Sequence, residues 1–121
     1  MNKKKIYILE REERAGLIEG MIRKHGVVEN IEIKVEHEYN GIIPKEYDTY
    51  LIHLGLTDRE AVIKMRKELP EKIVRITFLA GRFFVPSKLR DIYYTYDDEG
   101  AIKLVLSELG VLRNAQEGRI S

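Results

Sequence analysis

The segment Tyr47-Asp-Thr-Tyr-Leu-Ile-His53-Leu-Gly-Leu-Thr-Asp58 decides the fold. Its apolar residues, from about Thr49 to Leu54, are typical of a buried strand, and His53 lies near the carboxyl end of that strand. Thr57-Asp-Arg-Glu60 has the sequence of a capping box, which predicts that a helix begins soon after the strand. In an open parallel sheet, ligands bind at the carboxyl ends of the strands, so the sequence predicts a site around His53.

Strands alternate with helices along the rest of the chain, which indicates a parallel sheet with helices on both faces. Residues 31–37 alternate strictly between apolar and charged, so we expect this strand at an edge of the sheet with one face exposed. Residues 38–46 contain Gly41 and Pro44 and are too short and broken for a full helix. The other expected strands are residues 4–9, 73–80 and 92–96, and the expected helices are residues 12–24, 57–69 and one that Asp97 or Asp98 caps, with at most a short helix in residues 82–89.

Length and composition indicate one domain. The chain has 121 residues, of which 44% are hydrophobic, enough for one core and too few for two ordinary domains. We expect the domain to span residues 1–112 and a polar tail to span residues 113–121. The 21 basic and 20 acidic residues nearly cancel, which counts against a nucleic-acid or anionic-membrane partner. The absence of cysteine excludes disulfides and thiolate metal sites, and with no signal or membrane segment in the sequence it predicts a cytoplasmic protein.

This order of elements, with the second and fourth helices shortened, resembles the response-regulator receiver domain. The resemblance covers residues 4 to about 112. Two local matches support it: Tyr47-Asp48 leading into Leu51-Ile-His-Leu-Gly55, and Ile76-Thr-Phe-Leu-Ala80. It implies a flavodoxin-like α/β fold with three αβα layers, in which a five-stranded parallel sheet has the order 2-1-3-4-5.

Several of the residues that a receiver uses for phosphorylation are absent from this sequence. The resemblance places the phospho-accepting aspartate at His53, and it places the acidic pair that holds magnesium at Glu10 and Arg11. The hydroxyl residue and the lysine of the receiver site fall near Leu79 and Thr95. Aspartyl phosphorylation needs an acceptor carboxylate and a divalent cation held by carboxylates. The resemblance therefore implies a degenerate pseudo-receiver.

His53 has two interpretations. It is either a polar residue at the sheet rim, hydrogen-bonded to Glu10, Glu12 or a loop carbonyl, or a functional acid, base, phosphoryl acceptor or ligand-binding group. His25 and His37 do not have metal-ligand spacing, so we predict no metal site. We predict no cofactor either, because no glycine-rich dinucleotide loop follows the first strand.

A patch of aromatic and basic residues is the predicted partner-binding surface, because such residues are enriched at protein interfaces. It lies on the face through which receivers pair, so a homodimer is expected. The same mixture would suit single-stranded nucleic acid. Alternatively, the phenylalanines and tyrosines fill the core. The interface candidates are Phe83, Phe84, Lys88, Arg90 and Tyr94, next to Arg82.

Three functions remain open from the sequence. The first is a non-catalytic regulatory or protein-interaction module. It is favoured because the scaffold is intact while its catalytic positions are not. A chain with this function would not be an enzyme. The second is a nucleotide- or anion-binding protein or small enzyme that uses the crevice at the strand ends. The third is a nucleic-acid-associated protein. The candidate ligand-binding residues of the crevice are Glu10, Arg11, His53, Gly55, Thr57 and Arg82.

Overall fold

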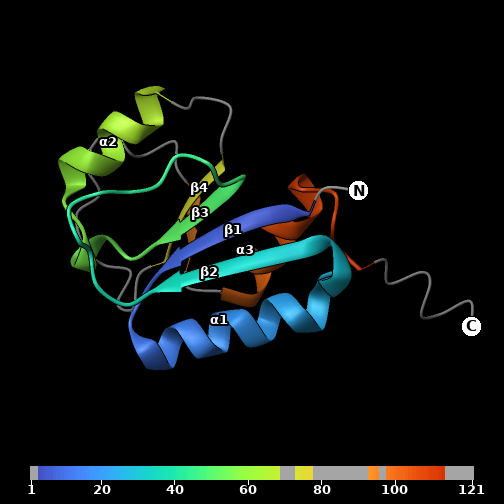
Figure 1. The fold of residues 1–121 in the computed structure, drawn as a ribbon. Coiled ribbons are helices and arrows are strands. Elements are labelled where there is room, and N and C mark those ends of the chain that lie inside the picture. The colour runs from blue at the N-terminus through green and yellow to red at the C-terminus, as the bar shows by residue number, and fades with distance from the viewer. Residues whose placement is uncertain (1–2, 69–72, 78–92, 96–97, 114–121) are drawn as a thin grey trace, which may run out of the picture.

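The chain folds around a five-stranded parallel sheet with the strand order β2-β1-β3-β4-β5 (Figure 1). The structure, a computed structural model, describes residues 3–68, 73–77, 93–95 and 98–113. Every pair of neighbouring strands is parallel, which confirms the predicted fold class. The strands are β1 (Lys4–Leu9), β2 (Ile31–Glu36), β3 (Thr49–Ile52), β4 (Ile73–Thr77) and β5 (Tyr93–Thr95), and the helices are α1 (Glu12–His25), α2 (Arg59–Glu68) and α3 (Asp98–Glu108), with short 3₁₀ turns at Val28–Asn30 and Leu54–Leu56.

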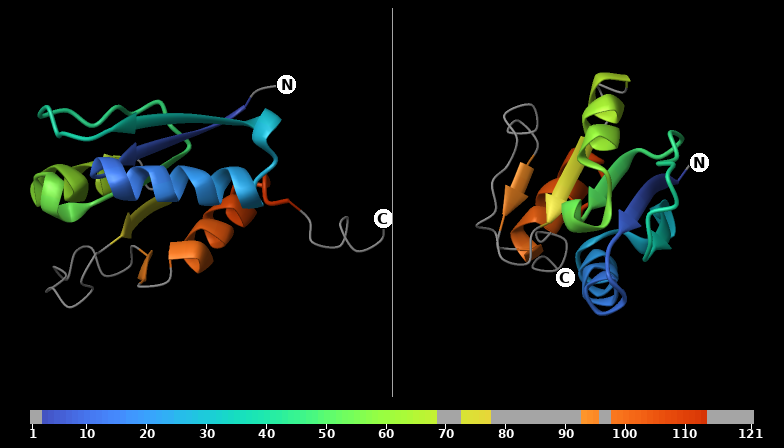
Figure 2. Two further views of the ribbon diagram at one scale, coloured as in Figure 1. Left: turned by 90° about the horizontal axis from the view of Figure 1, so that it is seen from below. Right: turned by 90° about the vertical axis from the view of Figure 1, so that its left-hand side faces the viewer.

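The helices α1 and α3 cover one face of the sheet, and α2 lies on the other (Figure 2). Ile6 and Ile8 of β1 point toward α1 and α3, because alternate residues of a strand face opposite sides of its sheet. They pack with Leu51 of β3 and with Ile18 of α1 and Leu106 of α3. All five side chains are buried, so this layer is the main hydrophobic core.

The opposite face of the sheet carries tyrosines. Tyr7 and Tyr50 alternate with the core residues of β1 and β3, and their ring centroids lie 5.9 Å apart. Tyr47 completes the cluster, with its ring centroid 5.4 Å from that of Tyr7. Burial raises the pKa of Tyr7 to about 12. Residues 37–48 run past this face without forming a helix, as the sequence predicted.

Helix α1 ends where a close contact requires glycine. The Gly26 N–H donates to the carbonyl of Ile22 at 2.8 Å, so it closes the last turn. A Cβ atom at position 26 would lie 2.5 Å from Cδ1 of Ile31 and 2.8 Å from that carbonyl oxygen. Only glycine fits between the helix and the start of β2. The helix ends at His25, one residue later than predicted.

Strand β2 occupies the predicted edge. Ile31 is buried and Ile33 and Val35 are half-buried, whereas Glu32 and Lys34 are exposed. This pattern confirms a strand with one face exposed to solvent. It pairs with β1 from Lys4↔Ile31 to Leu9↔Glu36.

Several element boundaries differ from the prediction. Strand β3 ends at Ile52 instead of residue 54, because the chain enters a 3₁₀ turn in which the Leu56 N–H donates to the His53 carbonyl at 3.0 Å. The predicted capping box also shifts by one residue. Oδ1 of Asp58, not the Thr57 hydroxyl, accepts the hydrogen bond from the Glu60 N–H at 2.9 Å. Helix α2 therefore begins at Arg59. The predicted end of β4 beyond Thr77 lies outside the described residues.

The segment after α3 returns to the end of α1. Val111 is buried, and its N–H donates to the Leu106 carbonyl at 2.9 Å. Arg113 donates its N–H to the His25 carbonyl at 2.6 Å and a guanidinium N–H to the Gly26 carbonyl at 3.2 Å. The predicted boundary between domain and tail stays a prediction, because residues 114–121 lie outside the described part. Among the described helices, none is long and apolar enough to cross a membrane.

Candidate functional site

The carboxyl ends of β1 and β3 bring Glu10 and His53 together. Leu9 and Ile52, the last residues of the two strands, are register partners. The His53 N–H donates to the Leu9 carbonyl at 2.9 Å, which continues the pairing by one residue. Both side chains therefore leave the sheet at the same edge. Glu10 is 1% exposed and His53 is 8% exposed, so the pair is buried.

The Glu10 carboxylate is surrounded by donors. Its Oε1 atom lies 2.8 Å from Nδ1 of His53 and accepts the Arg11 N–H at 2.8 Å. Its Oε2 atom lies 3.2 Å from Nε of Arg14, one turn into α1. Because a carboxylate only accepts hydrogen bonds, the bonding proton belongs to Nδ1 of His53. The result is a buried network of carboxylate, imidazole and guanidinium that joins β1, β3 and α1.

Further contacts hold this corner of the sheet, the carboxyl ends of β1 and β3 with Glu10 and His53, from both sides. The Glu10 N–H donates to the Glu36 carbonyl at 3.1 Å, and Nδ1 of His37 lies 3.0 Å from the Glu10 carbonyl oxygen. Gly55 packs against the His53 ring, since a Cβ atom there would lie 2.8 Å from Nε2. His53 is therefore held by its neighbours on two sides.

The structure brings together some of the predicted crevice residues. Glu10, His53 and Gly55 are in contact, and Glu10 is the partner of His53, one of the three partners that the sequence left open. Arg11 reaches the carboxylate through its backbone N–H, whereas its side chain is exposed. Thr57 is half-buried, and its buried hydroxyl has no hydrogen-bond partner. Arg82 lies outside the described residues, and a ligand-binding role for the set stays a prediction.

Sequence reasoning missed Arg14 and His37. The signal for Arg14 was its spacing of four residues from Glu10, which brings two side chains together across one helical turn. His37 had no comparable signal, because its contact depends on how the chain turns after β2.

His25 makes a second, more exposed contact at the other end of α1. Its Nε2 lies 2.6 Å from Oε2 of Glu99, and Nζ of Lys24 lies 3.5 Å from the same oxygen. The hydrogen bond from His25 and the charge of Lys24 lower the pKa of Glu99. This cluster joins α1 to α3. Among the described residues, no group of three acidic or histidine side chains is placed to hold a metal ion.

The predicted interface falls mostly outside the described residues. Four of the interface candidates lie outside the described residues: Phe83, Phe84, Lys88 and Arg90. Tyr94 lies on β5, where it is the register partner of Ile76 of β4.

The sheet order and the placement of the helices define a receiver-like α/β fold. Among solved structures, the chain is similar to the receiver domain of ChxR from Chlamydia trachomatis, with a TM-score of 0.57. The two share 18% sequence identity, and the match covers 88% of this chain and 99% of the ChxR domain. No family model and no curated protein sequence matches the chain. The likeness confirms the predicted fold.

Proposed function

We propose that this chain is a non-catalytic regulatory or protein-interaction module that has kept the receiver-like scaffold and lacks its phosphorylation chemistry. The observation that carries the proposal is the Glu10–His53 pair, which occupies the corner where the resemblance places the phosphorylation site. The buried ion-paired network at this position stabilises the fold. This chain has no carboxylate equivalent to the phospho-accepting aspartate of a receiver, because His53 takes its place.

The donor set at this corner does not fit magnesium. Magnesium prefers oxygen ligands in near-octahedral geometry. Glu10 supplies the carboxylate, but its Oε1 already interacts with Nδ1 of His53 and with the Arg11 N–H, and its Oε2 forms an ion pair with Arg14. The resemblance places the second acidic residue of the receiver pair at Arg11, which carries a positive charge. This site therefore does not support metal-dependent phosphoryl transfer.

His53 itself acts as a structural donor in this arrangement. Its Nδ1 is engaged by a carboxylate that is 1% exposed, and its backbone N–H continues the β1–β3 ladder. The site therefore ties the two central strands to α1. Regulation would then depend on the partners that the domain contacts, either as a homodimer or with another protein.

We also propose that the protein is cytoplasmic. The absence of cysteine is in keeping with that reducing compartment.

Incubation with acetyl phosphate and magnesium, followed by intact-mass spectrometry, tests the proposal. We expect the wild-type mass to stay unchanged, because the residue directly after β3 is His53 and not an aspartate. A functional receiver domain treated in parallel confirms that the donor is active. A stoichiometric gain of one phosphoryl group, with or without magnesium, would show that the proposal is wrong.

A second candidate function is binding of a nucleotide or another anion at the same edge of the sheet. The buried Thr57 hydroxyl without a hydrogen-bond partner favours it, since such groups in native proteins call for an explanation such as a bound water or ion. Isothermal titration calorimetry with inorganic phosphate and with a mixture of nucleotides separates the two functions. Saturable binding that Thr57→Val abolishes would support the second function over the first.

A further inference from the structure

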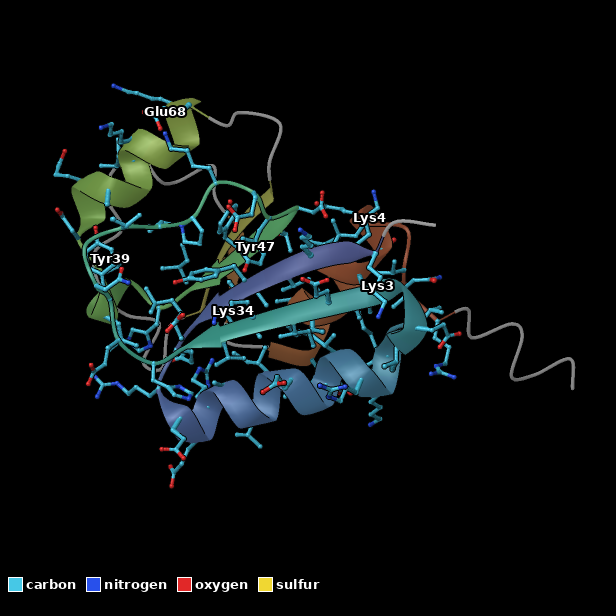
Figure 3. All side chains as sticks on the ribbon, in the orientation of Figure 1. Lys3, Lys4, Lys34, Tyr39, Tyr47 and Glu68 are labelled. Carbon is cyan, nitrogen blue, oxygen red and sulfur yellow. The ribbon has the colours of Figure 1, made fainter. Side chains whose placement is uncertain are left out.

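The outer edge of β2 has no strand paired with it in the described part of the chain. Among the described strands, β2 pairs with β1 alone and lies at one edge of the sheet (Figure 1). Figure 3 shows Lys34 on this outermost strand. The strand is six residues long and contains no proline. A regular edge of this kind is a template for another strand.

The outward-pointing backbone groups of β2 can be identified. The Glu36 carbonyl points toward β1, where it accepts the Glu10 N–H at 3.1 Å. Because backbone groups alternate in direction along a strand, Glu32 and Lys34 also bond toward β1. The N–H and carbonyl groups of Ile33 and Val35 therefore point away from the sheet. No other strand in the described part of the chain pairs with them.

The side chains of β2 divide into an apolar row and a charged row. Ile31, Ile33 and Val35 lie on the side of α1, and the last two are only half-buried. A cavity of about 60 Å³ lies between α1 and β2, lined by Ile31 and Ile33 together with residues of α1. Glu32 and Lys34 are exposed on the other face. The edge thus offers hydrogen bonds, apolar surface and charge together.

We propose that this edge binds a second copy of the chain by antiparallel β2–β2 pairing, with Ile33 opposite the partner's Ile33. In this register Glu32 lies opposite the partner's Lys34, and Lys34 lies opposite the partner's Glu32. Ile31 lies opposite the partner's Val35. The pairing is two-fold symmetric, so each contact occurs twice. The two sheets become one continuous sheet.

Charge complementarity selects this register over its neighbours. Outward-pointing residues must face each other, so the alternative registers differ by shifts of two residues. One shift places Lys34 opposite the partner's Lys34 and Glu32 opposite the partner's Glu36. The other shift places Glu32 opposite the partner's Glu32. Like charges directly opposite each other destabilise a strand pair, so the proposed register is favoured over both of these neighbours.

The proposed pairing also uses the free backbone groups. Each Ile33 exchanges two hydrogen bonds with the partner's Ile33, and each Val35 N–H donates to the partner's Ile31 carbonyl. The Ile31 N–H takes no part, because it donates to the Val28 carbonyl. On the α1 side, the two half-buried apolar rows meet and lose their exposure to water.

Charge reversal with a mixing step tests the proposal by sedimentation velocity across a concentration series. We expect wild type to dimerise at high concentration. Glu32→Lys and Lys34→Glu should each raise the dimer dissociation constant at least about tenfold, since attractive pairs become repulsive. A mixture of the two variants should form a heterodimer as tight as the wild-type dimer, because opposite charges then face each other again. Lys103→Glu, an exposed change on α3, is the matched control and should leave the dimer unchanged.

A single cysteine tests the register, because the native chain contains none. Ile33→Cys should form a disulfide-linked dimer under mild oxidation, and Lys103→Cys should not. Monomeric wild type at every concentration would overturn the proposal. So would a dimer that Glu32→Lys does not weaken, or a variant mixture that stays unpaired, because the dimer would then use another surface.

Discussion

At the scale of single residues, the surroundings of Glu10 restrict substitution at that position. Its carboxylate is buried and interacts with an imidazole, a backbone N–H and a guanidinium. A buried acceptor of this kind contributes mainly through the cost of leaving its donors without partners. His53 and Arg14 are therefore the residues that a change at position 10 affects first.

Glu10→Gln removes the charge while keeping the shape of the side chain. We expect it to lower the free energy of unfolding by about 2 kcal/mol, because charge-assisted hydrogen bonds become neutral and one donor loses its partner. Urea unfolding monitored by circular dichroism measures the change. Glu13→Gln on the exposed face of α1 is the control and should shift stability by less than about 0.5 kcal/mol. An unchanged midpoint for Glu10→Gln would show that the network contributes nothing to stability.

At the scale of elements, helix α1 contains a glycine that lowers its stability. Gly16 lies in the interior of the helix with nothing within 4 Å of the position that a Cβ atom would take. Glycine lowers helix stability, and no packing contact with the described residues requires it here. Leu17 beside it is 63% exposed.

Gly16→Ala should raise the free energy of unfolding by about 1 kcal/mol, because alanine restricts the unfolded chain and meets no clash. Thermal and urea unfolding both report this change. Gly26→Ala is the opposite case, since a Cβ atom there meets the Ile31 side chain and a backbone carbonyl. We expect that variant to be destabilised. A loss of stability in Gly16→Ala would contradict this prediction, because it would show that a Cβ atom is not accommodated at this position.

The contact between α1 and α3 should depend on pH. The pKa of Glu99 is lowered from 4.5 by His25 and Lys24, so Glu99 binds protons less readily in the folded state than in the unfolded state. Its contribution to stability is present above pH 4.5 and is lost as the pH falls through the lowered pKa. Glu99→Gln should therefore be less stable than wild type at about pH 6, and the difference should shrink on acidification. Urea midpoints measured along this series test the prediction, and a difference that does not change with pH would contradict it.

At the scale of the whole molecule, two surfaces are proposed to bind a second copy. One is the β2 edge, and the other is the predicted face from Arg82 to Tyr94, which lies largely outside the described residues. The two proposals are independent, because β2 and β5, the strand that contains Tyr94, form opposite edges of the sheet.

Phe84→Ala tests the second surface. An exposed aromatic anchor at an interface is worth about 2 kcal/mol on truncation, so the dissociation constant of a dimer formed through this face should rise about thirtyfold while the fold stays intact. Sedimentation equilibrium across a concentration series measures this constant, and circular dichroism checks the fold. Weakening by Phe84→Ala but not by Glu32→Lys would assign the dimer to this face. A variant that unfolds would mean that Phe84 belongs to the core.

The sequence by itself determined the elements and their order. Strand and helix periodicity depend on neighbouring residues, so the alternation of residues 31–36 was enough to place β2 at an edge, and the spacing in α1 identified its buried face. The contact between Glu10 and His53 was within reach because the carboxyl ends of parallel strands meet at one edge. Only the tertiary structure decided which of the possible partners His53 uses, that Arg14 and His37 join it, and that Asp58 replaces Thr57 as the helix cap. These contacts depend on how separate segments pack in three dimensions, which local patterns do not encode.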